Sequence, residues 1–108
     1  MKTGDIVLIP FPFAELTNRK VRPAVVVCET KDQFKDLVLC AISSVVHTPL
    51  SENELLVSPS PVNGLRKIST LKIDRIVTAK KDDIIARLGE LKETDLVAFR
   101  VKFKNLVD

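Results

Sequence analysis

Short apolar runs separated by turn residues recur along this chain and predict a sheet of several strands. Residues 24–28 and 37–42 are continuously apolar, which is typical of strands buried on both faces. A β-branched run at residues 6–9 ends at Pro10, because proline cannot donate to a strand ladder. Further strands are expected at residues 54–57, 68–77 and 86–91, and a single helical turn at residues 82–84.

The strand at residues 68–77 alternates apolar and polar positions from Leu71 onward. This pattern places Leu71 and Ile73 on the inner face, followed by Ile76 after a bulge or register shift. Lys72 and Asp74 are then expected to share the opposite face.

The C-terminal pattern permits either a strand or a helix. Residues 99–104 alternate strictly, but a longer apolar stripe has helical spacing, at Leu96, Phe99, Phe103 and Leu106. Thr94 as N-cap, Asp95 in the first turn and basic residues near the end favour a helix over residues 95–107. The fold class predicted is therefore α+β, mostly β: a small antiparallel barrel, or strongly bent sheet, with a C-terminal helix.

Composition is consistent with one folded domain over residues 1–108. The chain is 45% hydrophobic and 29% charged, enough apolar content for a core. Its longest uncharged apolar run, residues 37–46, falls short of the roughly 18 residues that a membrane-spanning helix needs. No signal-peptide pattern is evident, so we expect a cytoplasmic protein. A net charge of +3 permits contact with polyanions without demonstrating it.

The cysteines and the histidine do not form a metal-binding pattern. Cys28 and Cys40 end apolar runs and are predicted to be buried thiols, with a cross-strand disulfide as the alternative that a reducing cytoplasm disfavours. The single His47 starts a loop and is expected to face solvent. We expect neither a metal nor another cofactor.

Cations and hydroxyl groups are the remaining candidates for chemistry. Pro23 biases Arg22 toward an extended conformation. The guanidinium of Arg22 therefore projects from a defined place and can bind a phosphate through two hydrogen bonds. The alternative is a surface arginine beside a strand-starting proline. Ser43 and Ser44 can orient phosphate oxygens at a strand end, or can simply cap that strand.

Four segments in this order resemble the MazF/PemK toxin family. They are Gly4-Asp5-Ile6-Val7, Val21-Arg22-Pro23-Ala24-Val25-Val26-Val27, Cys40-Ala41-Ile42-Ser43-Ser44 and Leu71-Lys72-Ile73-Asp74-Arg75-Ile76-Val77-Thr78. The resemblance implies a homodimeric SH3-like barrel. It also implies a metal-independent, sequence-selective endoribonuclease that cleaves single-stranded RNA and is neutralised by a cognate antitoxin.

The family pattern also implies roles for individual residues. Arg22 matches the catalytic arginine, Ser43 the hydroxyl residue at the end of the third strand, and Asp74 an acidic position implicated in some members. The chemistry expected is attack of an RNA 2′-hydroxyl on its own phosphate, with Arg22 and Ser43 catalytic. The residues expected to hold the substrate are Thr17, Asn18, Arg19, Lys20, Pro23, Ser44, Lys72 and Asp74.

Two other functions stay open on the residues alone. The barrel can be a catalytically silent module that binds nucleic acid or a protein, or a structural domain in which the segment at residues 11–13 serves dimerisation. Four aromatic residues are expected to leave apolar surface for a dimer interface: Phe11, Phe13, Phe99 and Phe103.

Overall fold

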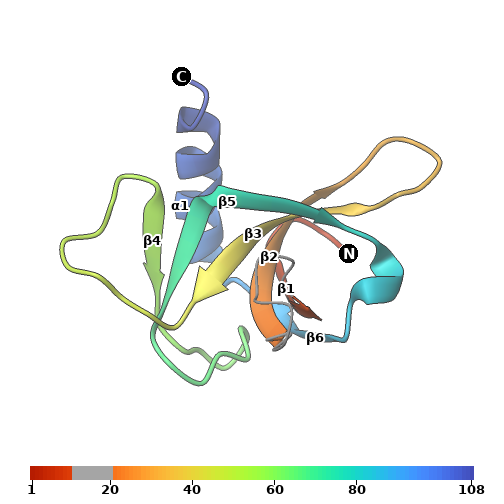
Figure 1. Ribbon diagram of the computed structural model, residues 1–108. Helices are drawn as coiled ribbons and strands as arrows, with labels where there is room; N and C mark the ends of the chain where they lie inside the picture. Colours follow the sequence, from red (N-terminus) through yellow and green to blue (C-terminus); the bar gives the residue numbers. More distant parts are fainter. Residues whose placement is uncertain (11–20) are drawn as a thin grey trace.

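The computed structural model describes residues 1–10 and 21–108 (Figure 1). Its strands form one antiparallel sheet in the order β4-β5-β3-β2-β1-β6. The elements are β1 (Asp5–Pro10), β2 (Val21–Glu29), β3 (Leu37–Ser43), β4 (Glu54–Val57), β5 (Ser69–Ala79), the 3₁₀ turn η1 (Lys81–Asp83), β6 (Ala86–Glu90) and α1 (Glu93–Asn105). The sheet is strongly curled, as the bend of β5 across Figure 1 shows, and this confirms the predicted fold class.

The sheet is packed on both of its faces. One apolar group, the helix-side core, lies between the sheet and α1 and contains Ile6, Val25, Cys40, Ile42, Leu71, Ile73 and Phe99. A second core, on the other face, contains Val7, Ile9, Ala24, Val26, Leu37, Leu39 and Val77. Neighbouring residues along a strand enter opposite cores because side chains alternate across a sheet. The continuous apolar runs of β2 and β3 are explained by this double burial.

The C-terminal helix was correctly expected, but it begins two residues earlier than predicted. Leu91 N–H donates to Gly4 O, so the chain is still attached to the sheet there. The first bond of the helix follows at once, from Leu96 N–H to Lys92 O. Lys92 is therefore the N-cap residue, and the prediction of Thr94 in that position was wrong.

Two apolar residues predicted to be buried, Cys28 and Ile76, are exposed. The β2–β3 register shifts between Val26 and Cys28, and Cys28 lies on the surface with a free thiol. In β5, Val77 lies opposite Leu39 and enters the second core, whereas Ile76 lies opposite Cys40, on the side of the helix-side core, but remains exposed there.

The aromatic residues of α1 belong to the core of this chain and not to its periphery, contrary to expectation. Phe99 is buried, and Phe103 packs against it with ring centroids 5.9 Å apart. The outer surface of α1 instead exposes Val97 and Val101. Phe11 and Phe13 lie outside the described residues. Among the described residues, no helix combines the length and apolar character required to cross a bilayer.

Candidate active site

Strand register places Arg22 and Ser43 on one face of the sheet. Ala24 of β2 lies opposite Ala41 of β3, and extending this register by two residues places Arg22 opposite Ser43. Directly opposite residues of an antiparallel pair project to the same face, with Cβ atoms about 5 Å apart. The two residues predicted to be catalytic are therefore neighbours.

The same face continues across β5 and β4. Lys72 of β5 lies opposite Ala41 on one side and opposite Glu54 of β4 on the other. We call this surface the site face and define it by Arg22, Ser43, Lys72 and Glu54. These residues lie on the side of the sheet opposite to α1, which they share with the second core, because the intervening residues of these strands enter the helix-side core. Ala24 and Ala41, which lie between these residues on the same face, are buried.

Hydrogen bonds hold the loop that follows Ser43. Val45 N–H donates to Ser43 Oγ at 3.1 Å, and the buried Thr70 donates from Oγ1 to Val45 O at 3.4 Å. Ser43 accepts this bond through a lone pair, so its own O–H proton remains available for a phosphate oxygen. Ser44 is exposed.

Glu54 is a residue of the site face that sequence reasoning missed. Its Oε2 atom lies 3.2 Å from Lys72 Nζ, and its Oε1 atom accepts a 2.8 Å bond from Ser51 N–H. These contacts hold the pKa of Glu54 below its ordinary value, the Ser51 bond first and the Lys72 bond second. The strand at residues 54–57 was predicted, but its pairing opposite Lys72 is visible only in the structure.

Asp74 and His47 lie near the edge of this site. Asp74 is in the bulge of β5 between the two paired segments of that strand, and it accepts a 3.5 Å bond from Asn53 Nδ2. His47 is exposed, as expected, and its electrostatic contribution to lowering the pKa of Glu54 is the smallest of the causes. Both residues are therefore associated with the β4 side of the site face.

Of the remaining predicted substrate contacts, Pro23 lies in β2 opposite Leu8 and is half-buried. Thr17, Asn18, Arg19 and Lys20 lie outside the described residues. Within residues 1–10 and 21–108, no three His, Cys, Asp or Glu side chains gather as metal ligands would.

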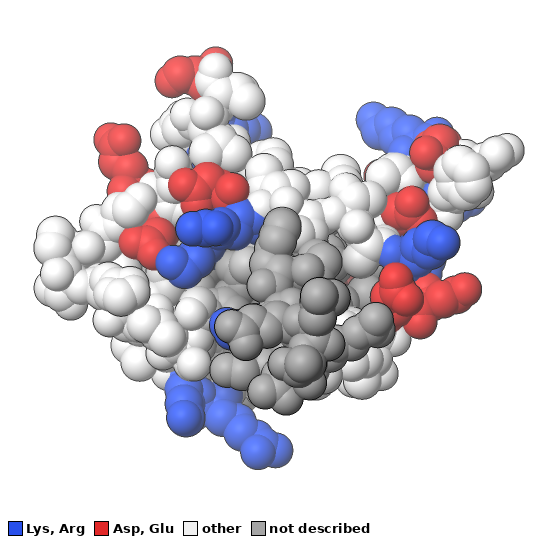
Figure 2. Space-filling view, in the orientation of Figure 1, with Lys and Arg blue, Asp and Glu red and all other residues white. Residues whose placement is uncertain are grey.

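Charge on the visible face is divided among small groups. Figure 2 shows several separate clusters of Lys and Arg, most of them beside acidic side chains, with one cluster at the lower edge standing apart. A broad basic surface is not seen among the described residues in this view. Phosphate binding at the site face would therefore rest on a few defined cations.

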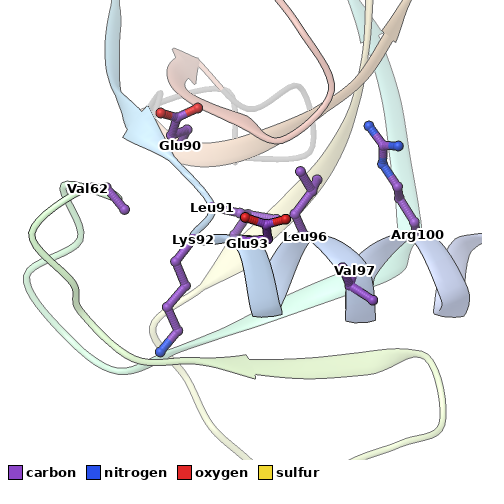
Figure 3. A pocket seen from close by; sticks show the side chains of 8 residues that line it. All are labelled: Val62, Glu90, Leu91, Lys92, Glu93, Leu96, Val97 and Arg100. Carbon is purple, nitrogen blue, oxygen red and sulfur yellow. The ribbon is translucent and has the colours of Figure 1, made fainter.

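A separate pocket lies where β6 passes into α1 (Figure 3). Its volume is about 530 Å³, and its lining residues are Val62, Glu90, Leu91, Lys92, Glu93, Leu96, Val97 and Arg100. The pocket contains none of the candidate catalytic residues, so it is distinct from the site face.

Known proteins resemble this chain in both sequence and fold. "Probable endoribonuclease MazF" of Mycolicibacterium smegmatis (strain ATCC 700084 / mc(2)155) is 29% identical over an alignment of 85 residues, and the match covers 72% of each chain. An endoribonuclease solved in complex with its cognate antitoxin, from a mycobacterial species, superposes with a TM-score of 0.75 at 16% identity, over 97% of this chain and 92% of that one.

Mycobacterium tuberculosis toxin MazF-mt6 superposes with a TM-score of 0.70 at 19% identity, over 96% of each chain. Residues 2–107, nearly the whole sequence, match the family described as PemK-like, MazF-like toxin of type II toxin-antitoxin system. The resemblance first seen in four short segments thus extends over the whole fold. The chain belongs to the PemK-like, MazF-like family of type II toxins.

Proposed function

We propose that this protein is an endoribonuclease that cleaves single-stranded RNA without a metal ion. The observation that carries the proposal is the placement of Arg22 opposite Ser43, with Lys72 on the same face. Family membership and the mycobacterial relative described as a probable endoribonuclease support it.

The proposed reaction is an internal transesterification. The RNA 2′-oxygen bonds to the adjacent phosphorus, the bond from phosphorus to the 5′-oxygen breaks, and the products are a 2′,3′-cyclic phosphate and a 5′-hydroxyl end. The 2′-hydroxyl loses its proton, and the departing 5′-oxygen gains one. Arg22 neutralises the negative charge that develops on the phosphorane, because its planar guanidinium is positively charged and can donate two parallel hydrogen bonds. Ser43 donates its hydroxyl proton to a phosphate oxygen, and Lys72 binds the neighbouring backbone.

We further propose that the protein acts as a homodimer and is inhibited by a cognate antitoxin. One structural relative is an endoribonuclease bound to its antitoxin. Val97 and Val101 leave an apolar stripe on the outer side of α1, and exposed apolar surface of this kind often marks an interface. Light scattering is expected to give twice the 12.0 kDa chain mass at micromolar concentration; the monomer mass would contradict the dimer.

Incubation of the purified protein with single-stranded RNA in excess EDTA tests the proposed chemistry. We expect cleavage that leaves 2′,3′-cyclic or 3′-phosphate ends and 5′-hydroxyl ends. A strict requirement for added Mg²⁺ or Mn²⁺, or the formation of 5′-phosphate ends, would overturn the mechanism.

A further inference from the structure

Glu54 is a fixed anion on the site face. The turn that precedes β4 is closed by a bond from Glu54 N–H to Ser51 O at 3.1 Å. The bond from Ser51 N–H to Glu54 Oε1, at 2.8 Å, ties the carboxylate back to the same turn. Backbone and side chain of Glu54 are thus anchored to one residue, and the carboxylate has little freedom to move.

Lys72 is held by this anchored carboxylate. Its Nζ atom donates to Glu54 Oε2 at 3.2 Å, while the other carboxylate oxygen is engaged by Ser51. A lysine ammonium has three N–H donors, so two remain for another ligand. With one donor fixed by Glu54, the directions of the other two are restricted.

The pair is also placed beside the predicted catalytic residues. Ser43 lies opposite Thr70 in β5, which makes Lys72, two residues further along that strand, a diagonal neighbour of Ser43. Diagonal neighbours in a sheet are about 7–8 Å apart, within reach of a long side chain. An RNA phosphate at Ser43 is therefore close enough for Lys72 to bind the same or the next phosphate.

Burial distinguishes this ion pair from the other lysine pairs of the described residues. The side chains of Lys72 and Glu54 are 25% and 12% exposed, whereas both partners of Lys2–Glu90 and of Lys81–Glu29 are more exposed. Exposed lysine pairs constrain their side chains weakly because both groups remain hydrated. Among the lysine pairs of residues 1–10 and 21–108, the Lys72–Glu54 pair is the one buried enough to hold its lysine in place.

We propose that Glu54 is a positioning residue, whose carboxylate holds the Lys72 ammonium on the site face so that it can bind an RNA phosphate beside Ser43. This inference rests on the proposed ribonuclease function. Glu54 acts through Lys72 and does not touch the substrate. A double-mutant cycle between the two residues is the appropriate test, because it measures whether they act as a unit.

The cycle compares wild type, Glu54→Gln, Lys72→Ala and the double variant in RNA cleavage and in binding of a 2′-O-methyl copy of a cleaved RNA. Glu54→Gln keeps the size of the side chain and an acceptor for Ser51 N–H, but it removes the charge. We expect Lys72→Ala to raise KM and Kd about tenfold, as loss of one charge-assisted contact does, with a smaller change in kcat. Glu54→Gln should raise both constants in the wild type and change them little in the Lys72→Ala background.

Glu29→Gln is the matched control. Glu29 also pairs with a lysine, Lys81, at 2.8 Å, and this bond is the main cause that lowers the pKa of Glu29. The variant removes the same charge outside the site face, so KM and Kd should stay at their wild-type values. A rise equal to that of Glu54→Gln would show a general charge effect and overturn the inference.

Three results of the cleavage and binding measurements would overturn the positioning role. The first is unchanged KM and Kd in Glu54→Gln, and the second is an equally large rise of KM and Kd when Glu54→Gln is made in the Lys72→Ala background. The third is tighter RNA binding by Glu54→Gln. The last result would make Glu54 a competitor of phosphate. Circular dichroism establishes whether each variant is folded.

An NMR measurement on the wild-type protein gives a second readout that needs no folded Glu54 variant. A lysine held by Glu54 should show an ammonium signal protected from exchange before RNA is added, assigned by its absence in Lys72→Ala. Absence of such a signal overturns the inference. If the wild type neither cleaves nor binds RNA, the proposed function fails, while this signal still reports on the positioning of Lys72.

Discussion

An ion pair between Asp5 and Arg87 links β1, the first strand along the chain, to β6, the last strand and its neighbour in the sheet. Arg87 Nη2 donates to Asp5 Oδ1 at 3.2 Å, and Lys2 N–H donates to Asp5 Oδ2 at 2.9 Å. The Asp5 carboxylate is buried, whereas Arg87 is partly exposed. Asp5 belongs to one of the segments that carry the family resemblance, and its contacts give it a structural role outside the site face.

Asp5→Ala should lower the free energy of unfolding by about 1–3 kcal/mol, because the substitution removes the buried acceptor of two hydrogen bonds, one of them from a charged guanidinium. Urea denaturation measures this change. Asp83→Ala, at an exposed acidic residue of η1, is the control and should alter stability by less than about 0.5 kcal/mol. Similar stability changes in both variants would contradict the structural role of Asp5.

Arg22→Ala should reduce RNA cleavage by about 10²-fold or more, the typical loss when a group that stabilises the transition-state charge is removed. The fold should persist, because the Arg22 side chain is only half-buried and lies near the beginning of β2. Single-turnover cleavage rates and thermal unfolding of the same samples test both statements. Arg22→Lys keeps the positive charge but loses the planar guanidinium group, so its cleavage rate should lie between those of wild type and Arg22→Ala. Wild-type rates in Arg22→Ala would show that the site is elsewhere.

Ser43→Ala should slow cleavage more than Ser44→Ala does. Ser43 lies on the site face opposite Thr70, whereas Ser44 follows the strand and is exposed. Ser43→Thr retains the hydroxyl and should recover most of the rate, which separates loss of the donor from disturbance of the loop at Val45. Cleavage rates of the three variants under identical conditions decide the order, and a larger effect at Ser44 would reverse the assignment.

The two thiols should differ in reactivity. Burial, with a smaller contribution from the charge of Asp74, raises the pKa of Cys40 to about 12, and its Sγ atom donates to Ile73 O. The thiolate is the reactive form, so iodoacetamide at pH 8 should modify the exposed Cys28 and leave Cys40 unmodified until the protein is unfolded. Mass spectrometry of proteolytic peptides identifies the modified residue. Equal labelling of both cysteines in the native protein would contradict the burial of Cys40.

The raised pKa of Cys40 also predicts a loss of stability in alkaline solution. An unfolded cysteine ionises near pH 8.5, whereas folded Cys40 keeps its proton to about pH 12. The stabilisation from the protonated thiol is therefore complete below the unfolded pKa and is lost as the pH rises toward 12. Urea denaturation at several pH values above 8 should show this decline, and the decline should be smaller in Cys40→Ala.

The sequence was sufficient to predict the strands because their apolar runs are buried on both faces, as at Val25 and Val26. It was insufficient where a bulge changes which residue points inward, as at Cys28, and where sheet contacts decide the start of the helix, as at Leu91. The site shows the same limit. Arg22 could be selected from its neighbouring proline, but the relation of Lys72 to Glu54 depends on pairing between strands that are distant in sequence.

The separation of the two sheet faces has an evolutionary consequence. Arg22, Ser43 and Lys72 project from the face opposite to α1, and the exposed valines of α1 lie on the far side of the helix-side core. Substitutions on the outer side of the helix need not disturb the register that assembles the site. Proteins with this fold can therefore vary the outer side of α1 during evolution while Arg22, Ser43 and Lys72 are selected separately.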